Sequence, residues 1–527
     1  MTVHVSGAAA DAVARHVPTL VATRFASRLS DGDDSLWGTA AQPEASIRLG
    51  WVHASSASRS LVTEIEAFRE EFTASGLTRV VLCGMGGSSL APEVITRTAG
   101  VELVVLDSTH PTQVARVVDA DIERTVVVVS SKSGSTAETD SQKRAFEAAF
   151  VEAGIDPAAR FVIVTDPDSP LDVSSRDAGY RVFNADPHVG GRYSALTAFG
   201  LVPSGLAGVD ISALLDEADA ALSALLEDSA ENPGLRLGAA MAGTQPRRDK
   251  MAIMTGETSI VGIGDWIEQL VAESTGKELT GVLPVVLERG APEPMADDLF
   301  VVNIVDDAVA ASGDSVTVAA PLGAQLLIWE VATAVAGHLL GTNPFDQPDV
   351  ESAKIAARTF LDGTPEPVTP FCTYGDVSMT AVGYSPAATT TAAAVRELLD
   401  QLPSDGYVSI HAYADREGGS GLEELRGVLA ATAHGRPVTF GWAPRFLHST
   451  GQYHKGGPAQ GVFLQIIELA DVDREVPDRP YSFGTLIAAQ ARGDAQVLAD
   501  HHRPVLTLTV TGPAGVRSFL AETAKLS

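Results

Sequence analysis

The sequence has few cysteines and few basic residues, and each shortage excludes a class of protein. Cys83 and Cys372 are the only cysteines among 527 residues, and no Cys/His group has zinc-ligand spacing. A disulfide framework and a structural zinc site are therefore not expected, and both thiols should be reduced in a cytoplasmic protein. Lys and Arg total 37 against 67 Asp and Glu, a formal net charge of −30, which argues against a nucleic-acid partner.

Uninterrupted hydrophobic runs are also scarce. The N-terminal MTVHVSGAAADAVARHV has no charged region followed by an apolar stretch, so we expect no signal peptide. The longest candidate span, 322–341, contains Gln325, Glu330 and His338, which favours a buried amphipathic helix over a membrane span. The sequence therefore predicts a soluble protein without a membrane partner.

Short apolar runs that alternate with helical stretches are abundant. Runs such as RVVLCG, TVVVVSS and RFVIVTD are apolar on both faces, which predicts parallel sheets covered by helices on either side. A second block follows, and then a third after the three prolines of TPEPVTP. We predict an α/β fold divided into an N-terminal helical segment (1–72), a first α/β domain (73–210), a helical linker (211–244), a second α/β domain (245–363) and a C-terminal α/β region (364–527).

The first candidate motif is the glycine-rich turn Gly84–Ser89, which follows the run RVVLCG. Such a turn brings backbone N–H groups and a helix N-terminus close to an anion. The spacing is not GxGxxG and no acidic partner for a ribose is evident, so a dinucleotide site is not indicated. A tight structural turn explains this motif equally well.

The second motif is Ser131–Thr139, a turn that contains five hydroxyl residues and a lysine ahead of a helical run. Hydroxyls, backbone N–H groups and a helix dipole together form a cradle for phosphate oxygens. The alternative is helix N-capping, for which one Ser or Thr suffices, so we favour phosphate binding. This Ser-x-Ser-Gly-x-Thr turn resembles that of the sugar-isomerase (SIS) domain family, which binds phosphosugars.

Two further motifs supply a cation and a carboxylate. Arg192 follows two glycines in GGRYS, where an uncrowded backbone lets a guanidinium reach developing oxyanion charge. Gln269 and Glu273 are four residues apart in the helical run 265–277, so they project from one face, and a shielded carboxylate can act as a base. Taken singly, the first of these two motifs would be better explained by an arginine in a surface turn and the second by an exposed, solvated helix.

These four segments occur together in the order that is typical of the phosphoglucose isomerase family. GMGGSSLAPEV, SSKSGSTAET, GGRYSALTAFGLVP and EQLVAESTGK are followed by NPFDQPDVESAK, which resembles a later signature of that family. The resemblance covers roughly residues 35–362. It implies two SIS-type doubly wound domains with parallel sheets, a site in the cleft between them, a homodimer, and no metal or other cofactor.

The resemblance also implies a role for each matching residue. The residues implied to bind the sugar phosphate are Gly87, Ser88, Ser131, Lys132, Ser133, Ser135, Thr136, Thr139 and Gln269. Glu273 would move the proton between C2 and C1, Arg192 would stabilise the cis-enediolate, and Lys354 would take part in ring opening. The implied reaction is interconversion of D-glucose 6-phosphate and D-fructose 6-phosphate.

One departure from the family concerns the histidine that opens the sugar ring, which a neighbouring subunit usually provides. Between Glu273 and Lys354 the only histidine is His338, in an apolar helix. The segment FLHSTGQYHKGG (446–457) resembles one in a divergent branch that includes the isomerase half of transaldolase fusions; no transaldolase half is evident. We favour His454 for ring opening, with His448 a close alternative, and a polar loop remains a third interpretation.

Another departure is Ser-Gly-Ser in the hydroxyl turn, where many members have Thr-Phe-Thr. This difference leaves acceptance of mannose 6-phosphate open. A non-catalytic phosphosugar sensor is a further alternative, but it would not need Glu273, Arg192 or Lys354.

Overall fold

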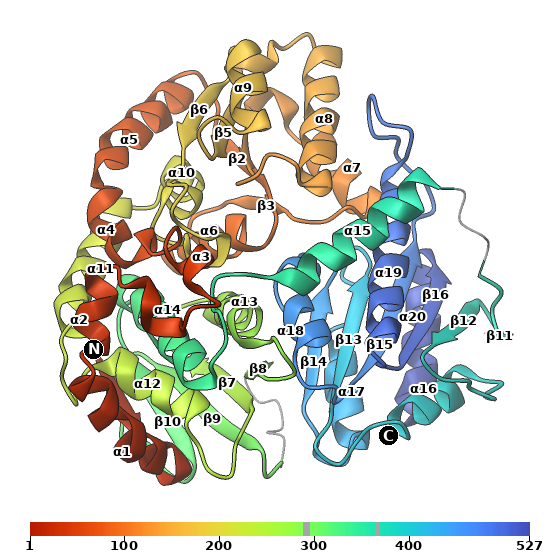
Figure 1. The fold of residues 1–527 in the computed structure, drawn as a ribbon. Helices are drawn as coiled ribbons and strands as arrows, with labels where there is room; N and C mark the ends of the chain where they lie inside the picture. The colour runs from red at the N-terminus through yellow and green to blue at the C-terminus, as the bar shows by residue number, and fades with distance from the viewer. Residues whose placement is uncertain (288–295, 364–367, 527) are drawn as a thin grey trace.

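The computed structural model describes residues 1–287, 296–363 and 368–526, and its three sheets form from the apolar runs of the sequence (Figure 1). The first sheet is parallel throughout, in the order β3-β2-β4-β5-β6. Its two central strands β4 and β5 are buried along their whole length because helices cover both faces. Its strands are β2 (Arg79–Gly84), β3 (Val104–Leu106), β4 (Thr125–Ser130), β5 (Phe161–Thr165) and β6 (Arg181–Asn184), and the helices of this part are α6 (Leu90–Ala99), α7 (Pro111–Asp119), α8 (Ala137–Glu152), α9 (Pro170–Asp177) and α10 (Ala198–Ala207).

The second sheet has the order β1-β10-β9-β7-β8 and is parallel except for β1. Its strands are β1 (Thr2–Val5), β7 (Lys250–Glu257), β8 (Leu283–Leu287), β9 (Leu299–Val305) and β10 (Ser315–Ala319). The strand β1, whose four residues pair antiparallel with β10, was not predicted from the sequence. The chain thus begins with a strand, and the helices α1 (Gly7–Ala22), α2 (Phe25–Ser30), α3 (Gln42–Ala45), α4 (Ala54–Ala57) and α5 (Arg59–Ala74) follow it.

Four helices accompany the second sheet: α11 (Ile211–Leu225), α12 (Pro233–Ala242), α13 (Ile263–Thr275) and α14 (Leu322–Leu340). By length and composition α14 could cross a membrane, but it packs against α11, α12 and α13. Every residue from 322 to 337 is buried, so the helix is not amphipathic as predicted but is covered on all sides. This is the environment of a core helix.

The third sheet has the order β11-β12-β16-β15-β13-β14. Its strands β16, β15, β13 and β14 are parallel, and the hairpin β11-β12 adds to β16 in the antiparallel direction. The strands are β11 (Cys372–Tyr374), β12 (Val377–Val382), β13 (Tyr407–Tyr413), β14 (Val438–Trp442), β15 (Gly461–Leu469) and β16 (Val505–Thr511), and the helices are α16 (Thr391–Leu399), α17 (Glu424–Thr432), α18 (Gly451–Gly456), α19 (Phe483–Asp500) and α20 (Gly512–Thr523). The proline-rich segment expected as a boundary, 364–370, lies partly outside the described residues.

The first sheet has its topological switch point between β2 and β4, which is where ligands bind in open α/β sheets. Gly84 at the end of β2 lies opposite Ser130 at the end of β4, so the two candidate anion turns start side by side. Figure 1 shows α13 in the middle of the molecule, with α15 (Pro348–Asp362) crossing from it to the third sheet. The predicted α/β class with parallel sheets is confirmed.

Ion pairs that are buried or half-buried connect the third sheet and its helices to the elements around the first sheet. Arg416 and Arg445, here called the arginine pair, both contact Glu93 of α6 and Asp107, which follows β3. Burial would raise the pKa of Glu93, but the charges of the arginine pair lower it to about 2. These contacts bring the segment that contains His448 close to the end of β2.

Candidate active site

A cavity of about 390 Å³ lies at this switch point and contains most of the residues predicted for the site. It is lined by turns after β2, β4 and β6, by α13 of the second domain, by the start of α15 and by the short helix 445–448 of the third region. The predicted residues that line it are Gly87, Ser88, Ser131, Lys132, Ser133, Thr136, Arg192, Gln269, Glu273, Lys354 and His448. Ser135, Thr139 and His454 do not line it.

The two glycine-rich turns are in direct contact, which explains their composition. A Cβ on Gly87 would lie 2.0 Å from the carbonyl oxygen of Gly191, a distance that real side chains do not reach. Gly86 has a φ of +55°, and its Cβ would lie 2.6 Å from the carbonyl oxygen of His448. Only glycine therefore lets the turns after β2 and β6 and the helix 445–448 approach one another around the cavity.

The hydroxyl turn leaves the N-terminus of α8 available to an anion. Thr136 occupies the N-cap position, yet its side chain makes no capping hydrogen bond. Its Oγ1 instead accepts from the Ser131 hydroxyl at 3.2 Å, and the Ser133 and Ser135 hydroxyls lie 2.9 Å apart. The simple capping interpretation is therefore wrong for Thr136, and unpaired N–H groups at a helix start attract phosphate.

Two cations stand beside this turn. Lys132 Nζ lies 2.7 Å from Asp166 Oδ2; burial lowers the pKa of the lysine, while this carboxylate favours its charged form. Arg48 also lines the cavity, and its Nη1 donates to the Pro187 carbonyl at 2.9 Å. Arg48 was not predictable from the sequence, since it belongs to the N-terminal segment and to no recognisable motif.

Glu273 and Gln269 project from one face of α13 into the cavity, as their spacing predicted. Both are buried, so the alternative of a solvated helix face is wrong for this pair. Gln269 Nε2 donates to Glu273 Oε2 at 3.1 Å and to the His448 carbonyl at 2.7 Å. Its Oε1 is buried and, among the described residues, has no hydrogen-bond partner, so it can accept from a ligand hydroxyl.

Arg192 faces Glu273, with Nη1 3.3 Å from Oε1. Only 4% of the arginine is exposed, so it is not the residue of a surface turn. Its Nε donates to the Ser274 hydroxyl at 2.8 Å, and Nη1 donates to Gln347 Oε1 at 2.9 Å. A fixed positive charge beside a buried carboxylate suits stabilisation of an oxyanion formed next to a base.

His448 is the one histidine among the described residues that line the cavity. Its Nε2 lies 2.9 Å from Oε1 of Glu138, which also accepts from Gln490 Nε2 at 2.7 Å. Burial would raise the pKa of Glu138, but the charge and hydrogen bond of His448 bring it below its ordinary value. Glu138 is a second residue whose role was not predicted from the sequence, although it lies within the motif SSKSGSTAET.

His454 lies in the core of the third region. Its Nδ1 is 2.9 Å from the Tyr407 hydroxyl and its Nε2 is 3.3 Å from the Ser409 hydroxyl. Burial holds the pKa of His454 well below its ordinary value, so its ring is neutral. This position, on α18 and away from the cavity, does not place the ring where ring opening would need it.

The remaining predicted residues lie at the edges of the site. Lys354 Nζ lies 3.5 Å from Glu351, and the side chain is 41% exposed, so it can move toward a ligand. Ser135 lines a second cavity of about 290 Å³, which Lys354 also lines, and Thr139 is buried behind the hydroxyl turn. In the described part of the chain, no group of three or more His, Cys, Asp or Glu is arranged to hold a metal ion.

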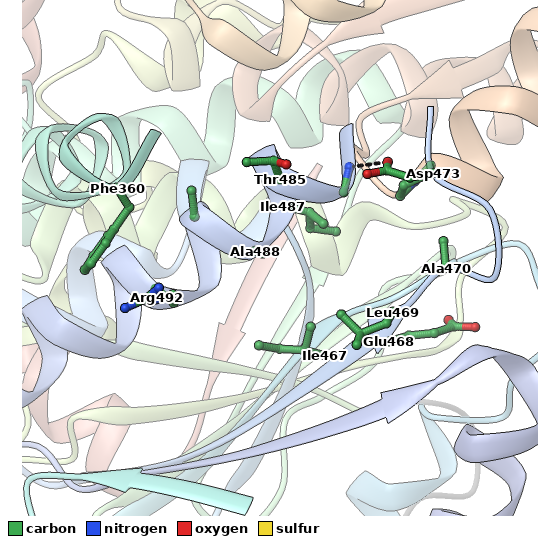
Figure 2. Close-up of a pocket in the computed structure, with 13 residues that line it drawn as sticks. Phe360, Ile467, Glu468, Leu469, Ala470, Asp473, Thr485, Ile487, Ala488 and Arg492 are labelled. Atoms are coloured by element: carbon green, nitrogen blue, oxygen red, sulfur yellow. Dashed lines mark hydrogen bonds between the residues drawn. The ribbon is translucent and has the colours of Figure 1, made fainter. Parts of the chain in front are cut away.

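Another pocket, of about 370 Å³, contains none of the predicted residues (Figure 2). It lies between β15 and α19, and Phe360, Ile467, Leu469 and Ile487 make it largely apolar. The Asp473 carboxylate at its rim accepts from the backbone N–H of Gly484 at 2.8 Å, at the start of α19. Nothing in this pocket matches the chemistry of the first cavity.

The chain is similar in sequence to proteins of one family. The phosphoglucose isomerase family matches residues 53–283. A glucose-6-phosphate isomerase of Rubrobacter xylanophilus is 30% identical over 358 residues, an alignment that covers 54% of this chain and 83% of the relative. One of Gloeothece citriformis is 28% identical, covering 55% of this chain and 67% of the relative.

Two solved structures are similar in fold. A hypothetical protein from Thermus thermophilus aligns with a TM-score of 0.56 and 25% identity over 67% of this chain and 97% of its own. A glucose-6-phosphate isomerase from Chlamydia trachomatis aligns with a TM-score of 0.50 and 22% identity over 64% of this chain and 78% of its own.

The relatives put the protein in the class of phosphosugar isomerases, and its parallel α/β fold is consistent with that class. Within that class the chain belongs to the phosphoglucose isomerase family, as a divergent member, and it is an isomerase. Lys354 and His448 lie outside the residues that the family matches, so the geometry of the cavity alone connects them to the site.

Proposed function

We propose that the protein interconverts D-glucose 6-phosphate and D-fructose 6-phosphate through a cis-enediolate. The observation that carries the proposal is the Glu273–Arg192 pair, which faces the same cavity as the open N-terminus of α8. A sugar phosphate needs such a pairing of an anion site with an acid/base centre. A phosphosugar sensor would need only the anion site.

The hydroxyl turn would bind the phosphate. Ser131, Ser133 and Thr136 line the cavity, and the N–H groups of the first turn of α8 add donors without adding charge. Lys132 and Arg48 stand close enough to the turn to supply positive charge. A chain with a net charge of −30 can thus bind an anion, because the attraction is local.

Proton transfer would centre on Glu273. As a carboxylate it can remove the proton from C2 of the open-chain aldose and return it to C1, leaving the oxygen-bound protons to be exchanged within the site. Arg192 would stabilise the negative charge that develops on the enediolate oxygens. Gln269, held by His448 and Glu273, would accept a hydrogen bond from a sugar hydroxyl through its unpaired Oε1.

Ring opening would involve His448 and not His454, because His448 lines the cavity. Glu138 orients the imidazole through Nε2, so the ring can pass a proton between the ring oxygen and the anomeric hydroxyl. Lys354, which lines the same cavity, would contact the sugar during the same step.

The test is an assay of fructose 6-phosphate formation from glucose 6-phosphate, with mannose 6-phosphate as a second substrate. We expect Glu273→Gln to lower kcat by about 10²–10⁴-fold, the usual contribution of a general base. Glu268→Gln is the matched control, since Glu268 lies on the same helix but lines a different cavity. An inactive wild-type protein would refute the proposal, and an undiminished kcat for Glu273→Gln would refute the assignment of the base.

A further inference from the structure

Lys277 is a buried cation that the proposed chemistry leaves without a role. It follows α13, four residues after Glu273, and only 4% of it is exposed. A buried ammonium is costly unless it is paired and hydrogen-bonded. Its Nζ donates to Asp346 Oδ1 at 2.7 Å and to the carbonyl oxygen of Asn343. Both partners belong to one short segment, 343–347, that joins α14 to α15.

The same segment holds the guanidinium of Arg192. Arg192 Nη2 donates to the Pro344 carbonyl at 2.7 Å and to the Asp346 carbonyl at 3.0 Å. Its Nη1 donates to Gln347 Oε1 at 2.9 Å. Lys277 and Arg192 thus both donate to this segment but to different acceptors, Lys277 to the Asn343 carbonyl and the Asp346 carboxylate and Arg192 to the neighbouring carbonyls. The position of the guanidinium therefore depends on where Lys277 holds the segment.

The charges around Lys277 fit this arrangement. The charged groups that face it are Asp346, Arg192 and Glu273. Burial, together with the charge of Arg192, lowers the pKa of Lys277 to about 7, while the two carboxylates favour its charged form. A lysine this strongly desolvated is held by its hydrogen bonds, and it donates to the segment whether or not it carries its proton.

We propose that Lys277 is a positioning residue: it fixes the segment 343–347 and thereby holds Arg192 against Glu273, where the enediolate charge develops. The inference rests on the proposed function, since it assigns Arg192 a task in the transition state. Lys277 does not line the cavity and so does not touch the substrate. Its loss should act on turnover more than on binding, because the hydroxyl turn that would bind phosphate belongs to another domain.

The experiment compares Lys277→Met, Arg192→Gln and the double variant by steady-state kinetics. We expect Lys277→Met to lower kcat by about 10–100-fold, the order of loss that a misplacement of about 1 Å produces, with KM changed by less than about threefold. The double variant should be no slower than Arg192→Gln alone, because Lys277 acts only through Arg192. Lys143→Met, which removes an ion pair on α8 outside the site, is the control.

A second variant addresses the chance that Lys277→Met does not fold. Asp346→Asn keeps the shape of the side chain, and the backbone carbonyl at this position still accepts from Arg192. The substitution weakens only the contact between this side chain and Lys277 Nζ. We expect it to lower kcat by a smaller factor than Lys277→Met, again at nearly constant KM.

Four outcomes overturn the inference. An unchanged kcat in both variants, or losses that add in the double variant, overturns it while the proposed function stands. A rise in KM at constant kcat assigns Lys277 to substrate binding and also overturns it. A wild-type protein without isomerase activity overturns the proposed function and the inference with it.

Discussion

The pairing of His448 with Glu138 leads to a quantitative prediction. The Glu138 carboxylate is buried and accepts from two donors, His448 Nε2 at 2.9 Å and Gln490 Nε2 at 2.7 Å. Both donors contact Oε1, so in Glu138→Gln the amide oxygen can still accept from them, but the negative charge that faces the imidazole is lost. A hydrogen bond to a charged group contributes about 1.5–3 kcal/mol, so ring opening should slow by about 10- to 150-fold.

The assay separates ring opening from proton transfer by choice of substrate. Fructose 6-phosphate is mostly cyclic, whereas 5-deoxyfructose 6-phosphate lacks the hydroxyl that closes the ring. We expect Glu138→Gln to lose activity on the first substrate and to retain it on the second, and His448→Ala to show the same pattern with a larger loss. Glu152→Gln, an exposed position at the end of α8, is the matched control.

Equal losses on both substrates would refute the reasoning, because they would place Glu138 and His448 in a step common to both. Full activity of Glu138→Gln on the cyclic substrate would refute it as well. In that case the contact between carboxylate and imidazole would contribute to structure only.

Three further predictions concern the assembly of the site and its stability. One chain supplies both Glu273 and His448 to the cavity. A mixture of Glu273→Gln and His448→Ala, unfolded and refolded together, should therefore show no more isomerase activity than the two variants refolded separately, and a gain in activity would show that sites are shared between chains. Gly87→Ala should lower the free energy of unfolding in a denaturant titration by about 1–3 kcal/mol, since its Cβ would meet a carbonyl of the facing turn. Gly190→Ala is the control, because its Cβ would have no atom within 4 Å and the free energy of unfolding should change little. Equal effects of the two substitutions would contradict the close contact. The lowered pKa of Glu93 stabilises the folded protein by on the order of 3 kcal/mol at pH values above 4.5, the ordinary pKa of a glutamate, and this stabilisation is lost as the pH falls toward about 2. The wild type should therefore lose more stability than Glu93→Gln over that pH range. Parallel curves of unfolding free energy against pH for the two proteins would refute the pairing.

Local sequence patterns were sufficient to predict the parallel sheets and the turns of the first sheet that line the cavity. Strands apolar on both faces predict a parallel sheet because helices must cover both sides, and β2, β4 and β5 form where those runs lie. The hydroxyl turn was predictable in the same way, since its residues are contiguous and begin a helix. The short β1 was missed because four residues at a sheet edge, of which only Val3 is buried, leave hardly any pattern.

Local sequence patterns could not decide whether His448 or His454 faces the cavity. The two lie six residues apart in the same glycine-containing segment, and either suits acid/base chemistry. The backbone from 445 to 448 turns toward Gly86, whereas α18 turns His454 into the aromatic core beside Tyr407. That direction depends on how the third sheet docks on the first domain.

Residues contributed singly by distant segments could be recognised only in the folded chain. Arg48 belongs to no motif, and although Glu138 and Lys277 lie within motifs, no local pattern assigns them a role. Their importance comes from what they approach: the phosphate end of the cavity, the ring of His448 and the segment that holds Arg192. The amino-acid pattern determined the strands, the anion turn and the helix face of Glu273, because these depend on neighbours in sequence. Tertiary packing decided which histidine faces the cavity and what holds the arginine, because those contacts join segments that are far apart in the chain.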